Sequence, residues 1–172
     1  IAGTDTDVGK TLITGYLARY FNQQGNTVTT QKWVHSGCNI PAQYLPEDIA
    51  RHEQIMNPIS ENTSHMSCPL VSLRCPYRFK LPASAHLAAE NENTPIDDTH
   101  IINCYQELVT KADMVLIEGI GGVHVPYSRT STLLDIQQAL NIPTILVVAN
   151  RLGAINHSLL TLEVLKHRNI PC

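Results

Sequence analysis

The sequence is poor in charge, in aromatic residues and in long apolar runs. Charged residues make up only 16% of its 172 residues and aromatic residues 5%, and the net charge is −3. A nucleic-acid-binding protein needs a clustered basic face, which 12 lysines and arginines against 15 acidic residues do not suggest. No run approaches the roughly 18 apolar residues of a membrane-spanning helix. We therefore expect no nucleic-acid partner and no membrane partner.

Closely spaced cysteine pairs are also missing. The five cysteines are an odd set without a Cys-x-x-Cys pair. That pattern argues against a disulfide framework and against a structural zinc site, and it favours reduced thiols in a cytoplasmic protein. What the sequence does have is 43% hydrophobic residues, which is enough to bury the core of one domain.

Both ends of the sequence have the pattern of a cut chain. Only Ile1 and Ala2 precede a glycine-rich loop of a kind that ordinarily follows a full strand. The segment 169–171 repeats the Asn-Ile-Pro of 141–143, and the earlier copy leads into an apolar segment. We expect a single domain over 1–172, truncated at both ends. A chance repeat is the alternative.

Apolar segments alternate with helical patterns along the chain. Apolar residues at helical spacing predict helices over 12–24, 47–57, 83–90, 99–109, 133–140 and about 157–168. β-branched or apolar runs predict strands over 27–32, 113–118 and 144–149, whereas 33–45 and 57–82 are expected to be loops. This alternation predicts an α/β fold with a doubly wound, mostly parallel sheet and helices on both faces.

The segment 3–11 has the pattern of a phosphate-binding loop. It reads Gly-Thr-Asp-Thr-Asp-Val-Gly-Lys-Thr and lies between a strand end and a helix start. Its backbone N–H groups form an anion site, Lys10 supplies a positive charge to phosphates, and the Thr11 hydroxyl can bind Mg²⁺. The first glycine stands one position earlier than usual. The alternative is a strand-to-helix turn in which Lys10 is merely solvated.

Two further charges are placed for nucleotide chemistry. Glu118 ends a nearly all-apolar strand and precedes a glycine-rich loop, where an acidic metal partner is expected. Lys32 ends the preceding strand and can face the same crevice. In each case the alternative is a strand-end charge that reaches solvent.

Four blocks together resemble the dethiobiotin synthetase family, a branch of the P-loop NTPases. They are the loop 3–11, matching G-T-D-T-x-V-G-K-T; 32–37, matching K-P-V-x-S-G; 118–126, matching E-G-A-G-G-x-x-x-P; and 151–157, matching K-L-G-x-I-N-H. The blocks occur in family order along nearly the whole chain. Trp33 departs from the pattern by replacing a proline, and 38–80 matches only loosely.

The resemblance implies an ATP-dependent cyclo-ligase of biotin biosynthesis. Such an enzyme closes a ureido ring on 7,8-diaminopelargonate with CO₂ or bicarbonate, uses ATP as co-substrate and Mg²⁺ as cofactor, and works as a cytoplasmic homodimer. One substrate amine becomes a carbamate, the carbamate takes the γ-phosphoryl group, and the second amine displaces phosphate. No enzyme nucleophile is needed, so positioning and charge neutralisation carry the catalysis.

The resemblance also assigns roles to particular residues. It implies that Lys10 and Lys32 are catalytic, with Lys32 serving the carbamate and the γ-phosphate. It implies a metal set of Thr11, Asp48 and Glu118, with Glu47 as the carboxylate adjacent to Asp48. It implies substrate contacts from Thr6, Ser36 and Asn156, the last from the partner subunit. The implied nucleotide-binding residues are Asp7, Val8, Gly9, Lys10, Thr11, Leu12, Asp48, Glu118, Gly119, Ile120 and Gly121.

Two other functions fit the same sequence. One is a related ATP-dependent amidoligase with another substrate, which would need a glutaminase domain that this sequence does not show. The other is an ATP-binding regulator or switch that closes no ring, an option left open by Trp33, Tyr127 and the divergent 38–80 segment. Dependence of ATP turnover on the diamine separates these possibilities from the synthetase.

Overall fold

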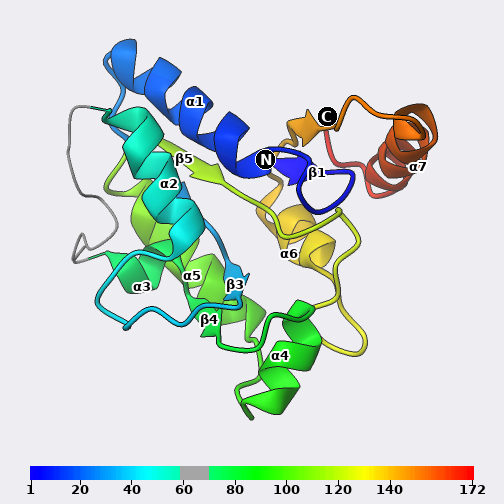
Figure 1. The fold of residues 1–172 in the computed structure, drawn as a ribbon, viewed down its shortest axis with the longest axis horizontal. Coiled ribbons are helices and arrows are strands. Elements are labelled where there is room, and N and C mark those ends of the chain that lie inside the picture. The colour runs from blue at the N-terminus through cyan, green and yellow to red at the C-terminus, as the bar shows by residue number, and fades with distance from the viewer. Residues whose placement is uncertain (59–69) are drawn as a thin grey trace.

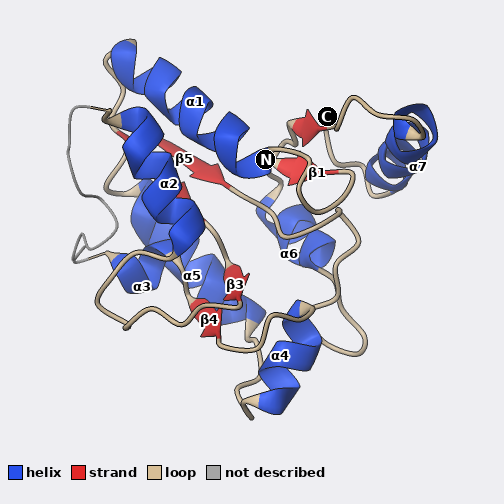
Figure 2. Ribbon diagram, viewed as in Figure 1, coloured by secondary structure: helices blue, strands red, loops and turns tan. Residues whose placement is uncertain are grey.

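The computed structural model describes residues 1–58 and 70–172 of the protein, which form helices around short parallel strands (Figure 1). Figure 2 shows the strands in the interior of the view, with helices around them. The helices are α1 (Lys10–Gln23), α2 (Glu47–Met56), α3 (Val71–Arg74), α4 (Ala85–Asn91), α5 (Asp98–Val109), α6 (Leu133–Leu140) and α7 (Ala154–His167). The strands are β1 (Ala2–Gly3), β2 (Val28–Gln31), β3 (Val34–Ser36), β4 (Tyr77–Phe79), β5 (Met114–Ile117) and β6 (Leu146–Val147).

The strands pair in three parallel ladders. β1 pairs with β6, β2 with β5, and β3 with β4. Backbone hydrogen bonds from Ile1 to Ile117 and from Gly119 to Ile1 also place β1 beside β5. Consecutive parallel strands need crossover connections, and helices supply them here. The α/β class with parallel strands is therefore confirmed.

This arrangement brings the ends of β1, β2 and β5 together. Glu118 follows β5, and its N–H donates to the carbonyl of Gln31 at the end of β2, 2.8 Å away. Gly119, one residue later, donates to Ile1 beside the phosphate loop, also at 2.8 Å. Lys32, Glu118 and the phosphate loop consequently meet at one end of the parallel strands, as expected for ligand sites in such sheets.

Helices α1 and α2 pack closely against each other and over β2. Gly15 of α1 makes the approach possible, because a Cβ atom there would lie only 2.8 Å from the side chain of Ile55. The largest apolar cluster lies elsewhere, between β3, β4, α4, α5 and α6. Its buried members are Trp33, Val34, Phe79, Ala85, Ala88, Ala89, Ile96, Ile101, Tyr127, Leu133 and Ile136.

Several predicted boundaries were wrong. The expected loop 33–45 contains β3, and the expected loop 57–82 contains α3 and β4; its part 59–69 lies outside the described residues. Both missed strands have three residues, too few for an apolar period to appear in sequence. The strand expected over 144–149 is reduced to β6, and α7 begins three residues before the expected 157.

The described residues also bear on the membrane and cysteine expectations. Within residues 1–58 and 70–172, no helix has the length and apolar content needed to cross a membrane. Cys38, Cys75 and Cys104 are buried free thiols, and Cys172 is an exposed one. Cys68 falls in the segment that is not described.

Candidate active site

The phosphate loop has the backbone conformation that its glycines allow. Gly9 caps α1 with φ 102° and Asp7 has φ 56°, both in the left-handed region. A Cβ at Gly3 would lie 2.8 Å from the Val8 side chain and 3.0 Å from the carbonyl of Asp5. Close packing thus requires glycine at position 3, one residue before the usual position in such loops.

Lys10 begins α1 and is buried, although its side chain remains at the cleft. Its Nζ donates to the carbonyl of Asp5, 2.7 Å away. Burial lowers the pKa of Lys10, with the nearby charge of Glu118 opposing that effect. A buried lysine at the beginning of a helix, held by its own loop, presents a positive charge to an incoming anion.

An open cleft of about 750 Å³ lies in front of this loop. It is lined by most of the residues that the sequence assigned to nucleotide, substrate and metal: Thr6, Asp7, Gly9, Lys10, Thr11, Leu12, Lys32, Ser36, Asp48, Glu118, Ile120 and Gly121. One cleft is therefore lined by residues from the phosphate loop, β3, α2 and the 118–121 loop. A cleft of this size accommodates a nucleotide together with a small substrate.

Lys32, Asp48, Glu118 and Thr11 form one hydrogen-bonded cluster in the cleft. Lys32 Nζ donates to Asp48 Oδ2 and to Glu118 Oε1, the latter at 3.1 Å. Thr11 Oγ1 donates to Glu118 Oε1 at 3.0 Å and lies 3.2 Å from Asp48 Oδ1. Lys32 and Glu118 are 7% and 3% exposed, so neither is a solvated strand-end charge.

The cluster's charges compensate one another. Burial alone would lower the pKa of Lys32, but Glu118 and Asp48 outweigh it, and the pKa of Lys32 is raised. Burial alone would raise the pKa of Glu118, but the hydrogen bond from His52 and the charge of Lys32 lower it to about 2. Glu118 is consequently an anion and Lys32 a cation at neutral pH.

The oxygen atoms of this cluster fit a magnesium ion bound together with nucleotide. Mg²⁺ in such sites takes one or two carboxylates plus phosphate oxygens and waters, and here the Thr11 hydroxyl lies 3.2 Å from an oxygen of Asp48 and 3.0 Å from one of Glu118. The described residues contain no group of three or more His, Cys, Asp or Glu side chains arranged as a metal cage. Thr11, Asp48 and Glu118 would hold the ion only with phosphate present.

The structure distinguishes Asp48 from its neighbour Glu47. Asp48 is half-buried and faces Thr11 and Lys32, whereas Glu47 is exposed and does not line the cleft. Both lie in the first turn of α2, where an acidic residue is favoured. Position on the helix decides which carboxylate reaches the site.

Three predicted site residues do not line the cleft. Val8 is buried beneath the phosphate loop, against Gly3. Gly119 uses its N–H for the backbone bond to Ile1. Asn156, in the first turn of α7, is exposed and does not line the cleft of its own chain.

The cleft also contains residues that the sequence did not single out for it. His35 is buried, and its Nδ1 lies 3.4 Å from Asp48 Oδ2 without making a hydrogen bond. Ser84 precedes α4 as its N-cap but makes no side-chain capping bond, so its hydroxyl is open to a ligand. His35 fills the variable position of its motif block, and Ser84 follows a poorly matched segment. Only a serine before a helical pattern could have indicated Ser84.

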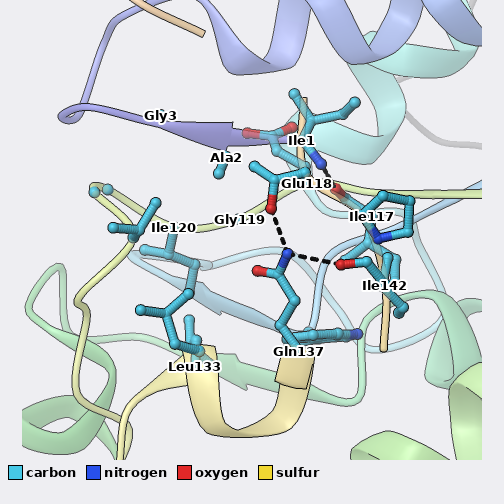
Figure 3. A pocket seen from close by; sticks show the side chains of 17 residues that line it. Ile1, Ala2, Gly3, Ile117, Glu118, Gly119, Ile120, Leu133, Gln137 and Ile142 are labelled. Atoms are coloured by element: carbon cyan, nitrogen blue, oxygen red, sulfur yellow. Dashed lines mark hydrogen bonds between the residues drawn. The ribbon is translucent and has the colours of Figure 1, made fainter. Parts of the chain in front are cut away.

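A second, smaller cavity of about 60 Å³ lies behind the 118–122 loop (Figure 3). Its walls are mostly apolar and come from β1, the 117–123 segment and α6. Gln137 crosses one side of it and donates to the carbonyl of Ile142 and to Thr144 Oγ1. Trp33, which replaces the family's proline, also lines this cavity and donates its indole N–H to Gln31. Trp33 therefore serves packing behind the site.

The chain is similar over its whole length to a known protein family and to several individual proteins. A family model described as an AAA domain matches residues 1–172. ATP-dependent dethiobiotin synthetase BioD 2 of Haemophilus ducreyi is 42% identical over 170 residues, which are 99% of this chain and 76% of the relative. BioD 2 of Haemophilus influenzae is 41% identical over 99% of this chain and 84% of its own length. For BioD of Chlorobaculum tepidum the figures are 40%, 99% and 68%.

Proposed function

The chain belongs to the family of ATP-dependent dethiobiotin synthetases, and from this membership we propose that it closes the ureido ring of dethiobiotin on 7,8-diaminopelargonate, consuming CO₂ and ATP. The observation that carries the proposal is the meeting of Lys10, Lys32 and two carboxylates in one cleft. A phosphoryl-transfer site needs that combination of fixed positive charge and metal ligands.

The chain's own groups have separate tasks in this reaction. The phosphate-loop N–H groups and Lys10 hold the phosphates of ATP. Lys32 lines the same cleft as the phosphate loop and Ser36, and there it neutralises the substrate carbamate as that group attacks the γ-phosphate. A bound Mg²⁺ ion would neutralise charge on the transferring phosphoryl group. In ring closure the second substrate amine attacks the carbon of the phosphorylated carbamate and inorganic phosphate leaves, so the protein's task is to position that amine.

We also propose that the enzyme is a cytoplasmic homodimer. Helix α7 has an apolar face that the described residues leave exposed: Ile155, Leu159 and Leu162 are 79%, 62% and 42% exposed. Their spacing places them on one side of the helix. Asn156, in the first turn of α7, is exposed and does not line its own chain's cleft, which supports a substrate contact made across the dimer. We propose in addition that the sheet is doubly wound, with helices on both of its faces.

The decisive experiment measures ATP turnover with diaminopelargonate and bicarbonate present and then absent. We expect turnover to require both, and dethiobiotin to form in equal amount to the phosphate released. Lys32→Ala should reduce ring closure by at least about a hundredfold while the protein stays folded, since it removes charge that counts most in the transition state. Turnover indifferent to the diamine would favour the regulator, and release of phosphate with another amine acceptor would favour an amidoligase.

A further inference from the structure

A buried histidine of α2 contacts the metal carboxylate of the cleft and belongs to none of the four motif blocks. His52 is 0% exposed, and its Nε2 lies 2.7 Å from Oε2 of Glu118. A carboxylate anion only accepts hydrogen bonds, so Nε2 carries the hydrogen and donates it. The other ring nitrogen, Nδ1, has no hydrogen-bond partner among the described residues.

Packing alone does not account for a histidine at this position. A buried polar atom without a partner is unfavourable, and an apolar side chain of similar volume would avoid it. The neighbouring buried positions of α2 include Ile49 and Ala50, which are apolar. What the imidazole adds over such a residue is the Nε2–H group aimed at Glu118.

This hydrogen bond divides the two oxygens of Glu118 between two tasks. Oε2 is taken by His52, whereas Oε1 faces the cleft and contacts Thr11 Oγ1 and Lys32 Nζ. A carboxylate held at one oxygen cannot rotate freely about its last bond. Oε1 is thereby fixed on the side where the Thr11 hydroxyl points.

The helix that carries His52 is itself held in place. Asp48 lies one turn before His52, so both side chains are on the same side of α2. The next residue, Glu53, forms a buried ion pair with Arg74 at 2.7 Å. Arg74 in turn donates to the carbonyl and hydroxyl of Thr30 in β2. This clamp fixes the distance between α2 and the strand that leads to Lys32.

We propose that His52 is a positioning residue: by holding Oε2 of Glu118 it fixes Oε1 as a single-oxygen ligand for the metal ion that accompanies the nucleotide. The inference rests on the proposed function in taking Glu118 as a metal ligand. It adds His52, a residue outside the four motif blocks, as the hydrogen-bond partner of Glu118. Such outer partners of metal ligands typically contribute about 10- to 100-fold in metal affinity.

The test compares two replacements of similar size with different hydrogen-bonding capacity. His52→Leu fills the space but cannot donate, whereas His52→Gln places an amide N–H close to the position of Nε2. The measurement is Mn²⁺ binding in the presence of a non-hydrolysable ATP analogue, by electron paramagnetic resonance, with the melting temperature recorded for each variant. We expect His52→Leu to weaken Mn²⁺ binding by about 10- to 100-fold and His52→Gln to restore most of it.

A double variant tests whether the effect passes through Glu118. In a Glu118→Gln background, His52→Leu should cause little further loss, because the oxygen that it positions is already changed. If His52→Leu does not fold, His52→Asn replaces it, since its amide ends short of Glu118. Unchanged Mn²⁺ affinity in His52→Leu, equal weakening by Leu and Gln, or additive losses in the double variant would each overturn the proposal.

The readout separates this inference from the ring-closing reaction. Mn²⁺ binding is measured with the nucleotide analogue alone, without diamine or bicarbonate. If the protein closes no ring but His52→Leu weakens Mn²⁺ binding and His52→Gln restores it, the proposed function fails and the role of His52 stands. If rings form normally but His52→Leu and His52→Gln bind Mn²⁺ equally well, the proposed function stands and the role of His52 fails.

Discussion

The nucleotide cleft and helix α7 both depart from the usual rule that charged side chains are exposed and apolar ones are buried. The cleft buries charged side chains, and α7 exposes apolar ones. In the cleft, charged side chains are buried: Lys10, Lys32 and Glu118 all have less than a tenth of their surface exposed. On α7, large apolar side chains are exposed: Leu159 and Leu160 show more than half of theirs. Figure 1 shows α7 apart from α1 and α2.

The two regions differ in what completes them. The buried charges of the cleft are already paired within the chain, through Lys32, Asp48 and Glu118, so the region is stable without a partner while keeping oxygen atoms directed at a ligand. The apolar face of α7 has no such compensation within the described residues. Buried charge that is paired indicates chemistry, whereas an exposed apolar face indicates assembly.

The largest effect should come from removing the phosphate-loop charge of the cleft. Lys10→Ala should lower turnover by at least about a hundredfold, because a fixed cation acting on the transferring phosphate is lost. Folding should be preserved, since among the described residues Lys10 Nζ donates its hydrogen bond to its own loop. Steady-state phosphate release and circular dichroism measure the two effects. Normal turnover with an intact fold would mean that the loop does not bind the reacting phosphate.

Glu118→Gln should act mainly through the metal. The amide keeps the size of the side chain and loses the charge, so the Mg²⁺ concentration needed for half-maximal turnover should rise about tenfold or more. The melting temperature should change far less than activity does. A titration of turnover with Mg²⁺ measures the effect. If activity stays below that of the native protein even at saturating Mg²⁺, the charge of Glu118 acts on the substrate directly.

Lowering the pH should reveal how much the ionised Glu118 carboxylate stabilises the fold. The pKa of Glu118 is lowered from 4.5 to about 2, so its stabilising contribution is present above about 4.5 and is lost as pH falls towards 2. Between pH 5 and pH 2 the native protein should therefore lose more unfolding free energy than Glu118→Gln does, by up to about 3 kcal/mol. Urea unfolding across that range measures it, and parallel curves for the two proteins would contradict the lowered pKa.

The residues with the largest expected effects could be recognised from the sequence, and the reason is physical. Lys10, Lys32 and Glu118 each stand at the end of a strand or the beginning of a helix, and parallel strands bring such ends together. The segments between them were less readable. β3 and β4 have three residues each and are defined by their mutual pairing, which no local period reveals.

His52 and Ser84 were missed for a related reason. A histidine on the buried side of a helix has the same sequence pattern as a core residue, and only the arrival of Glu118 from β5 gives it a partner. Ser84 shares the cleft because β3 and β4 pair, not because of its own surroundings in the sequence. The residues found by sequence carry their chemistry in local patterns, and the residues missed acquire theirs from distant contacts.

Breaking the α7 face should have a smaller effect than breaking the cleft. Leu159→Lys places a charge in the centre of the proposed dimer contact and should raise the dimer dissociation constant by about tenfold or more, since burying one such side chain contributes about 1.5–3 kcal/mol. His167→Lys, an exposed polar change on another side of the same helix, is the control. Sedimentation velocity measures the assembly. An unchanged molecular mass in Leu159→Lys would place the subunit contact elsewhere.

The smallest and sharpest contrast lies between two adjacent carboxylates of α2. Asp48 contacts Thr11 and Lys32, whereas Glu47 is exposed, although both favour the helix N-terminus equally. Asp48→Asn should therefore lower Mg²⁺-dependent turnover by roughly tenfold, the lower end of the usual range for such groups, and Glu47→Gln should leave it nearly unchanged. Because each variant removes one negative charge from the same helix turn, any effect of net charge or of the helix dipole is common to both. Turnover of both variants over a Mg²⁺ series gives the answer. Equal losses would mean that the helix end as a whole, rather than the aim of one side chain into the cleft, determines metal binding here.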